Sequence, residues 1–338
     1  MRRLRFAWID DENKKVESFR AAIEGGIGSR GTAHIEYLPV PKNVLEELAI
    51  WAKSVARRPP NLIIVDHIFA KSHAFGLKGS SVAHLLRNTL PTTPMVCVTA
   101  MLERKSAFDQ EDLSEYTAVI GYTDLEEHIE TLYAIAQDFR KVVPKGRTVR
   151  EHTIAALKPP ARDKADLLRI LPEEFQNQAR PTTPHRIASW IYNVLLDRPG
   201  FLYDRLNSAT LLGLNEKAFD RIKPMFERAM YKGPFASLSR PRWWVSAIRK
   251  ALFHMVDPSV PDAPQLAGRT LPGITEQDFS VCYVSKKSVP PPDAVALTDA
   301  TRSAQQRVVR REFAVKHPQD PGTMPGFETR LVLRKGRR

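Results

Sequence analysis

Acidic and hydroxyl side chains directly follow three apolar runs in the first third of the chain. Asp10 and Asp11 end the first run, Asp66 ends the second and Thr99 ends the third. Carboxylates that meet at one edge of a sheet repel one another, so they need a hard cation between them. Mg²⁺ prefers oxygen ligands of this kind. The spacing therefore predicts a magnesium site formed by Asp10, Asp11 and Asp66.

The elements that must position these side chains alternate between strand and helix along residues 1–140. Apolar runs of strand length are followed by segments whose apolar residues recur at helical spacing. The expected strands are Arg5–Ile9, His34–Leu38, Asn61–Asp66, Pro94–Thr99 and Thr117–Gly121, and the expected helices are Lys14–Glu24, Val44–Val55, Ser80–Arg87 and Leu125–Arg140. This alternation predicts an α/β fold, a doubly wound parallel five-stranded sheet with helices on both faces. Functional groups of such sheets gather beyond the carboxyl ends of the strands.

Residues 4–140 resemble the receiver domain of two-component response regulators, the CheY-like fold. The resemblance rests on the acidic pair after the first strand, on Asp66 and Thr99, and on the run Pro94–Ala100. It implies that Asp10 and Asp11 hold Mg²⁺ and that Asp66 accepts a phosphoryl group from a histidine kinase or another phosphodonor. Thr99 would then report on the state of Asp66.

Two residues depart from the receiver pattern at positions that take part in the conformational switch of that family. Tyr122 stands at the position of the family's lysine, which neutralises phosphoryl charge, and Val119 lies near the place of its aromatic switch residue. The loop after Asp66 is longer than usual and contains Lys71, which is either a replacement cation or a solvated loop residue. The alternative to a working receiver is therefore a pseudo-receiver that docks a protein partner or a second copy of the chain.

The charge of the chain is concentrated in its second half. The formal net charge is +13, and residues 151–338 carry 30 Lys and Arg against 19 Asp and Glu, a balance of +11. Such asymmetry indicates a neutral module joined to one that meets an anionic partner, most often nucleic acid. The alternative is a basic domain without an anionic partner.

Composition shifts and proline-rich stretches divide the chain into a receiver-like domain and a basic half. The expected parts are the receiver-like domain at 1–141, a linker at 142–162, a mostly helical, winged-helix-like basic domain at 163–256, a Pro-rich linker at 257–274 and a small basic α+β segment at 275–338. Within them, Thr183 and Pro184 are typical of a helix start. In the last segment, strand-like runs at 279–284, 294–297 and 329–333 flank a predicted basic helix containing Arg307 and Lys316.

The segment 208–222 resembles a helix-turn-helix. Ala209 is small where two helices would cross, Gly213 suits the turn and Asn215 can cap the second helix. In DNA-binding domains of this kind the second helix enters the major groove. The residues expected to contact nucleic acid, most simply DNA, are Lys217, Arg221, Lys223, Arg240 and Arg242. The alternatives are a helix pair that touches no DNA, and core positions for Trp243 and Trp244 in place of base stacking.

The sequence lacks the motifs that identify several functional classes of protein. Cys97 and Cys282 are too far apart in sequence for a metal knuckle, and no membrane span, signal peptide, phosphate-binding loop or hydrolase motif is present. We therefore expect a cytoplasmic protein that is not an enzyme beyond phosphoryl acceptance at Asp66, with Mg²⁺ as its one cofactor. The leading interpretation is a regulator whose receiver-like domain controls a nucleic-acid-binding domain. The alternatives are a protein–protein adaptor and a phosphate sink for a histidine kinase.

Overall fold

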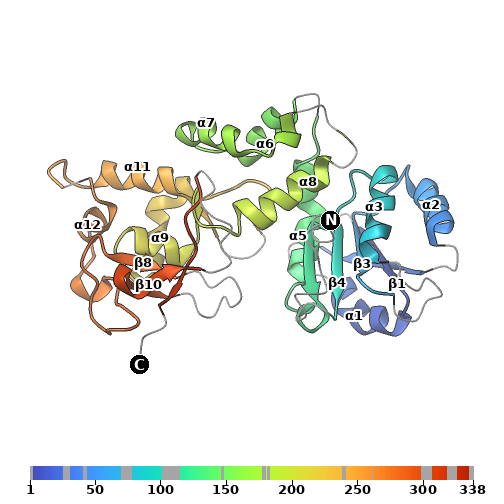
Figure 1. Cartoon of the computed structure of the whole chain (residues 1–338), viewed down its shortest axis with the longest axis horizontal. Helices are drawn as coiled ribbons and strands as arrows, with labels where there is room; N and C mark the ends of the chain where they lie inside the picture. Colours follow the sequence, from blue (N-terminus) through green and yellow to red (C-terminus); the bar gives the residue numbers. More distant parts are fainter. Residues whose placement is uncertain are drawn as a thin grey trace. The chain divides into compact units, whose positions relative to one another are not determined.

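The computed structural model describes residues 3–25, 31–40, 44–69, 78–100, 115–145, 148–176, 180, 183–237, 241–260, 262–297, 307–317 and 326–334. The chain forms two compact units (Figure 1). Unit 1 comprises Met1–Ala156, Pro172–Val194 and Ser237–Ser239, and unit 2 comprises Leu157–Leu171, Leu195–Ala236 and Arg240–Arg338. Among the described residues, none of the helices has the length and apolar character that crossing a membrane requires.

A five-stranded parallel sheet forms the centre of unit 1. Its strands are β1 (Leu4–Asp10), β2 (Ala33–Pro39), β3 (Leu62–Asp66), β4 (Met95–Thr99) and β5 (Ala118–Gly121), in the order β2-β1-β3-β4-β5. This is the doubly wound order found in flavodoxin and CheY. The predicted parallel five-stranded sheet is confirmed, with each strand within two residues of its expected bounds.

Helices cover both faces of this sheet. They are α1 (Asn13–Gly25), α2 (Val44–Val55), α3 (Gly79–Thr89) and α5 (Ile129–Asp138), followed by the 3₁₀ turn Phe139–Lys141. The last helix begins four residues later than predicted, because Tyr122–Asp124 form a 3₁₀ turn and residues 125–128 form further turns. This delay leaves Tyr122 at the edge of the sheet, directly after β5.

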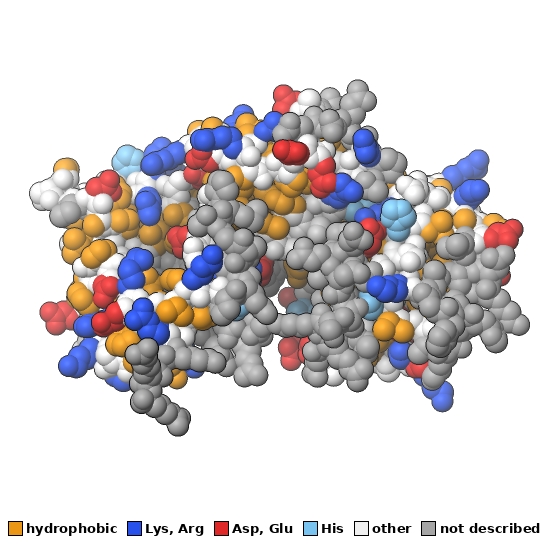
Figure 2. Space-filling view, in the orientation of Figure 1, with side chains coloured by type: hydrophobic (Ala, Val, Ile, Leu, Met, Phe, Trp, Pro, Cys, Tyr) orange, Lys and Arg blue, Asp and Glu red, His pale blue; other side chains and the backbone are white. Residues whose placement is uncertain are grey.

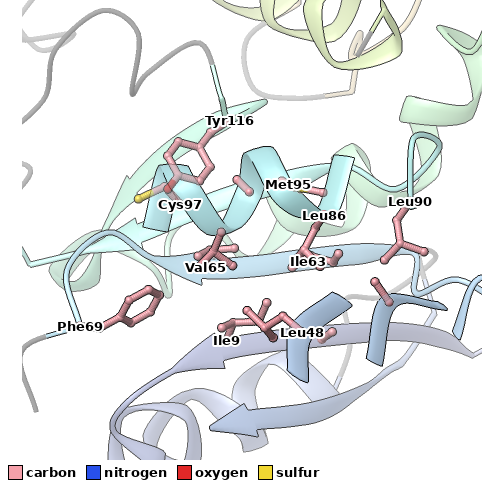
Figure 3. Packing of buried hydrophobic residues seen from close by; sticks show 14 residues of the cluster. Ile9, Leu48, Ile63, Val65, Phe69, Leu86, Leu90, Met95, Cys97 and Tyr116 are labelled. Carbon is pink, nitrogen blue, oxygen red and sulfur yellow. The ribbon is translucent and has the colours of Figure 1, made fainter. Parts of the chain in front are cut away.

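Alternation along the buried strands separates two cores. Trp8 of β1 packs against Phe19 of α1, with ring centroids 6.3 Å apart, so its face of the sheet meets α1. Its neighbour Ile9 points to the other face and joins the cluster formed with α2 and α3 (Figure 3). Fully burying a side chain of this size contributes about 1.5–3 kcal/mol. Packing on both faces of the sheet fixes the positions of the carboxyl ends of the strands.

The interval expected as the first linker is partly helical. Helix α6 (Val149–Leu157) lies within residues 142–162, and its Val149, Ile154 and Leu157 are buried. Helix α8 (Thr183–Trp190) starts at the predicted threonine and groups with unit 1 instead of the basic half. The ring centroid of its His185 lies 5.0 Å from that of Phe139, a contact within unit 1.

Unit 2 is mainly helical with short antiparallel ribbons. Its helices are α7 (Ala161–Ile170), α9 (Arg205–Leu211), α10 (Glu216–Ile222), α11 (Val245–Met255) and α12 (Pro264–Arg269). The ribbons pair β6 (Leu202–Tyr203) with β7 (Trp243–Trp244), β8 (Ala294–Ala296) with β9 (Val308–Arg310), and β10 (Ala314–Lys316) with β11 (Leu331–Leu333). Helices therefore make up most of the regular secondary structure in the described part of unit 2.

Two expectations for the C-terminal part are wrong. The Pro-rich stretch 257–274 is no free linker, because it contains α12, whose Ala267 packs with Leu212 in the core of unit 2. The predicted basic helix is replaced, over its described residues, by β9, a 3₁₀ turn and β10. The β-branched pair Val308 and Val309 suits a strand, and the buried Val309 anchors it. The strand-like run 279–284 forms isolated bridges only.

Candidate functional site

The three predicted carboxylates meet at the carboxyl edge of the sheet. Asp10 is the last residue of β1, Asp66 is the last residue of β3, and Asp11 follows β1 directly. One carboxylate oxygen from each of the three lies within 4.8 Å of the others. Three oxygen ligands at this separation fit a hard divalent cation. The parallel pairing of β1 with β3 produces the convergence, as the sequence pattern predicted.

Asp10 is fully buried, and both of its carboxylate oxygens accept hydrogen bonds. The backbone N–H of Glu12 donates to Oδ1 at 2.8 Å, and the hydroxyl of Tyr122 donates to Oδ2 at 2.6 Å. Burial raises the pKa of Asp10, and these two hydrogen bonds counteract part of that rise. Asp10 therefore belongs to a fixed network in this structure.

Asp66 is almost as deeply buried, with 5% of its side chain exposed. The backbone N–H of His67 donates to Oδ1 at 2.7 Å, and the ammonium of Lys15 donates to Oδ2 at 3.3 Å. Burial and then the negative charge of Asp10 raise the pKa of Asp66 to about 6, although Lys15 and these hydrogen bonds lower it. At neutral pH the carboxylate is mostly ionised and can act as a nucleophile.

Lys15 is the functional residue that the sequence analysis missed. It lies in the first turn of α1, and its ammonium is 3.8 Å from a carboxylate oxygen of Glu12 and 5.1 Å from the centroid of the Tyr122 ring. Burial opposes the charged form of Lys15, but the carboxylates, Asp66 first, outweigh burial and raise its pKa. In the sequence, the signal that could have identified Lys15 is its position shortly after the acidic pair Asp10 and Asp11. The predicted candidate Lys71 lies outside the described residues.

Tyr122 and Thr99 lie at the same edge. Thr99 ends β4, is buried, and pairs in register with Gly121, the residue before Tyr122. The Tyr122 ring packs 6.4 Å from that of Trp8 and 6.2 Å from that of Phe19, centroid to centroid. Burial and the nearby carboxylates raise the pKa of Tyr122 far above its usual value, so its hydroxyl stays protonated. Tyr122 is thus a hydrogen-bond donor and cannot supply positive charge.

The start of α3 fits tightly against β3. The backbone N–H of Gly79 donates to the carbonyl of His67 at 2.8 Å. A Cβ atom at position 79 would run into the carbonyl oxygen of Asp66 and would lie 2.9 Å from the hydroxyl of Tyr116. Glycine at position 79 therefore allows α3 to approach the residue that ends β3.

The predicted helix-turn-helix segment forms two short packed helices. Ala209 is buried, Gly213 has a φ of +68° in the turn, and Oδ1 of Asn215 accepts a hydrogen bond from the N–H of Ala218 at 2.9 Å. The helix pair is therefore present, with seven residues in each helix. A winged-helix architecture does not follow from this pair.

The predicted nucleic-acid-contacting residues differ in what they touch. Lys217 is exposed, whereas Arg221 pairs with Asp278 at 2.8 Å and Lys223 pairs with Asp220 at 3.2 Å. Two of these three cations are therefore paired with carboxylates within unit 2.

The second group of predicted contacts, around position 242, is internal. The half-buried Arg242 donates from Nε to the Leu196 carbonyl at 3.0 Å and lies 3.4 Å from Asp204, and Arg240 lies outside the described residues. Trp243 and Trp244 are 2% and 3% exposed, so their expected core positions are confirmed. Arg242 therefore contributes to the packing of unit 2.

Solved structures similar to part of this chain include an adenylate cyclase from Rhodopirellula baltica, 13% identical over 40% of this chain and 91% of that one, with a TM-score of 0.30. A CheY-like response regulator receiver domain protein from Methanospirillum hungatei JF-1 is 17% identical over 40% and 98%, with a TM-score of 0.28. The signal receiver domain of an HD domain-containing protein from Pseudomonas fluorescens Pf-5 is 11% identical over 42% and 96%, with a TM-score of 0.31. No family model and no curated protein matches the chain. The strand order alone carries the fold assignment: the N-terminal part of the chain is a receiver-like α/β domain.

Proposed function

We propose that this chain is an atypical signalling protein whose receiver-like domain accepts a phosphoryl group on Asp66 and thereby controls the basic unit 2. The observation that carries the proposal is the Lys15 ammonium, 3.3 Å from Oδ2 of Asp66. Phosphoryl transfer concentrates negative charge at the acceptor, and a fixed cation at that place stabilises its transition state. Lys15 supplies this cation from α1, where Tyr122 cannot supply it from the end of β5.

The proposed transfer uses the ionised form of Asp66. A carboxylate oxygen of Asp66 attacks the phosphorus of a phosphodonor and forms the new oxygen–phosphorus bond. The bond from phosphorus to the leaving group breaks, and its electron pair departs with that group. The resulting acyl phosphate carries charge that the Lys15 ammonium offsets. Because the pKa of Asp66 is about 6, the nucleophile is available at neutral pH and is lost in mild acid.

The donor set at this edge also fits Mg²⁺. Asp10, Asp11 and Asp66 would hold the ion through oxygen atoms that lie within 4.8 Å of one another. When bound, such an ion offsets charge on the transferring phosphoryl group. Tyr122 restrains Asp10 meanwhile, because its hydroxyl occupies Oδ2. Tyr122 thus acts as a positioning residue for one of the carboxylates.

The proposed output of the receiver-like domain is nucleic-acid binding by unit 2. The net charge of +11 over residues 151–338 supports a polyanionic partner. A histidine kinase or another phosphodonor would supply the phosphoryl group. A protein–protein adaptor with an unphosphorylated pseudo-receiver and a phosphate sink without output are the two competing functions.

The test is incorporation of labelled phosphate from acetyl phosphate in the presence of Mg²⁺. We expect labelling of the wild-type chain, none of D66N, and a rate for K15M lower by about 10²–10³-fold, the usual effect of losing one transition-state donor. K14M is the matched control, since Lys14 is the exposed neighbour of Lys15 on the same helix. Equal rates for K15M and K14M would remove Lys15 from the mechanism.

The competing functions give other outcomes in the same series. Absence of labelling at any pH between 6 and 8 would overturn phosphoryl acceptance and favour the adaptor. Labelling without any affinity for nucleic acid would favour the phosphate sink. The proposal is supported by labelling together with an affinity for nucleic acid that falls steeply as the salt concentration rises, because contacts to phosphates weaken in this way.

A further inference from the structure

One face of α11 in unit 2 carries two exposed basic side chains beside the partly buried Phe253. Arg249, Lys250 and Phe253 follow Ser246 at spacings of three, four and seven residues, so the four side chains lie on one side of the helix. Ile248 and Leu252 are buried in the core of unit 2, whereas Arg249 and Lys250 are exposed.

Three cavities meet along this face, and Arg249 lines all of them. A cavity of about 580 Å³ lies between the start of α7 and α11 and is also lined by Arg162, Lys250 and Phe253. A cavity of about 170 Å³ shares Arg162 and Ser246 with it. A third, of about 430 Å³, extends to Arg311. We call these three neighbouring cavities, which share Arg249, the α11 groove, defined by Arg162, Ser246, Arg249, Lys250, Phe253 and Arg311.

The four cations of the α11 groove form no ion pair with a described carboxylate, and Arg162 alone acts at longer range on Asp163, whose pKa its charge lowers. Over the described ranges, Arg162, Arg249, Lys250 and Arg311 form no ion pair, whereas Arg221 of α10 and Lys223, the residue after this helix, do. An ion-paired cation must break its pair to bind a phosphate, and an unpaired one need not. The groove is therefore better suited to an anionic partner than the α10 surface. Lys and Arg side chains are spread over the left-hand part of the molecule in Figure 2.

Three carboxylates also line the cavities, against the four cations. Asp163 accepts a hydrogen bond from Ser246 at 2.5 Å, and burial raises its pKa. Glu328 accepts a hydrogen bond from Tyr203, and desolvation raises its pKa to about 7. Asp262 is the third carboxylate. Near neutral pH the balance of charge along the groove is therefore positive.

We propose that the α11 groove binds the sugar-phosphate backbone of single-stranded nucleic acid. This deepens the proposed function, on whose nucleic-acid output it rests. Cations along a hollow can contact the phosphates of a single nucleic-acid strand while its bases stack on an aromatic side chain. In the α11 groove this side chain is Phe253. Reading a duplex instead needs an element that projects into its major groove. Cavities lie along this face of α11 and no projecting element is part of the proposed site, which favours the single strand.

The salt dependence of binding tests the number of cations involved. The probe is a fluorescent oligonucleotide of about ten nucleotides, within the ~4–16 that single-strand sites cover. Each phosphate contact contributes about −0.7 to the slope of log K against log salt. Four contacts predict a slope of about −2.8, so affinity falls about 50-fold between 50 and 200 mM salt. For R249Q/K250Q the slope is expected to be about −1.4, a fall of about 7-fold over the same range.

A matched variant controls for net charge. R228Q/K232Q removes one arginine and one lysine from exposed positions of unit 2 outside the groove, and we expect it to bind as the wild type does. Glutamine has nearly the helix propensity of arginine and lysine, so R249Q/K250Q should keep α11 folded. An unchanged unfolding temperature in both variants verifies this. An equal loss of slope in the two variants would overturn the groove as the site.

The remaining outcomes separate this inference from the proposed function. If K217Q/K223Q loses the salt-dependent binding and R249Q/K250Q keeps it, the α10 surface is the site and the inference is wrong. Tighter binding of the duplex form of the same oligonucleotide would overturn the single-strand assignment. Absence of binding by the wild-type chain would overturn the nucleic-acid output and this inference together, while labelling of Asp66 by acetyl phosphate would still stand.

Discussion

Replacing Asp66 by asparagine is expected to stabilise unit 1, because this carboxylate is ionised at a cost. The pKa of Asp66 is about 6 in the folded chain, against an ordinary value of 3.8. Each pKa unit corresponds to about 1.36 kcal/mol, so ionising Asp66 at pH 7 costs about 3 kcal/mol of stability. The side chain is only 5% exposed, so solvent screening does little to reduce this value. Asparagine has the shape of the protonated carboxyl group and avoids the cost.

The sign of the pH dependence follows from the direction of the shift. Between pH 3.8 and about 6, the folded chain keeps a proton on Asp66 that the unfolded chain has lost. Stability from this group is therefore full below pH 3.8 and declines as the pH rises through about 6. The advantage of D66N should be about 3 kcal/mol at pH 7 and about half of that at pH 5. For a unit of this size it raises the unfolding temperature by about 6–12 °C at pH 7.

The assay is thermal unfolding of the wild-type chain and D66N at pH 7 and pH 5, without Mg²⁺. E126Q, which removes an exposed carboxylate from the same unit, serves as the control and should leave the unfolding temperature nearly unchanged. A D66N chain no more stable than the wild type at pH 7 would refute the reasoning. A gain of equal size at both pH values would also refute it, since the gain would then not come from ionisation.

Three further substitutions test the neighbours of Asp66. K15M should raise the pKa of Asp66 above about 6, by about 1–3 units, and an unchanged carboxyl ¹³C NMR titration would contradict this. Y122F should lower the free energy of unfolding by about 1.5–3 kcal/mol, because the 2.6 Å hydrogen bond to the charged Asp10 is lost; urea unfolding equal to wild type would be contrary evidence. G79A should cost about 1–3 kcal/mol through overpacking against the Asp66 carbonyl, and a wild-type unfolding temperature would show that α3 can move away.

The sheet and its acidic edge could be predicted because both depend on strong local patterns. Four-to-seven-residue apolar strands alternate with amphipathic helices, and Asp10, Asp66 and Thr99 end their strands. Parallel pairing then brings these ends to one edge without further information. Lys15 could not be found in this way, because the direction of a first-turn side chain depends on how α1 packs on the sheet. Trp8 and Phe19 determine that packing, and their contact is tertiary.

The C-terminal part was harder to predict because its elements are short. Strands β8, β9, β10 and β11 have three residues each, too few for alternation to be distinguished from a helical period. The structural role of proline in this part of the chain was also ambiguous, because proline occurs both in linkers and in the first turn of helices. Pro264 was interpreted as part of a linker, but it occupies the first turn of α12, where its missing N–H costs nothing.

Lys15 and Tyr122 contact different carboxylates of the acidic edge and lie close to each other. With tyrosine at the end of β5, no cation from that strand neutralises Asp66, and an uncompensated pair of buried carboxylates would shift toward protonation. Lys15 donates a hydrogen bond to Asp66 and lowers its pKa, while the hydroxyl of Tyr122 donates to Asp10. Each of the two buried carboxylates therefore has a side-chain donor of its own. Phosphorylation of Asp66 would act first on the Lys15 contact, since that side chain holds Oδ2. A change of state at this edge would therefore reach the surface through α1 more directly than through β5.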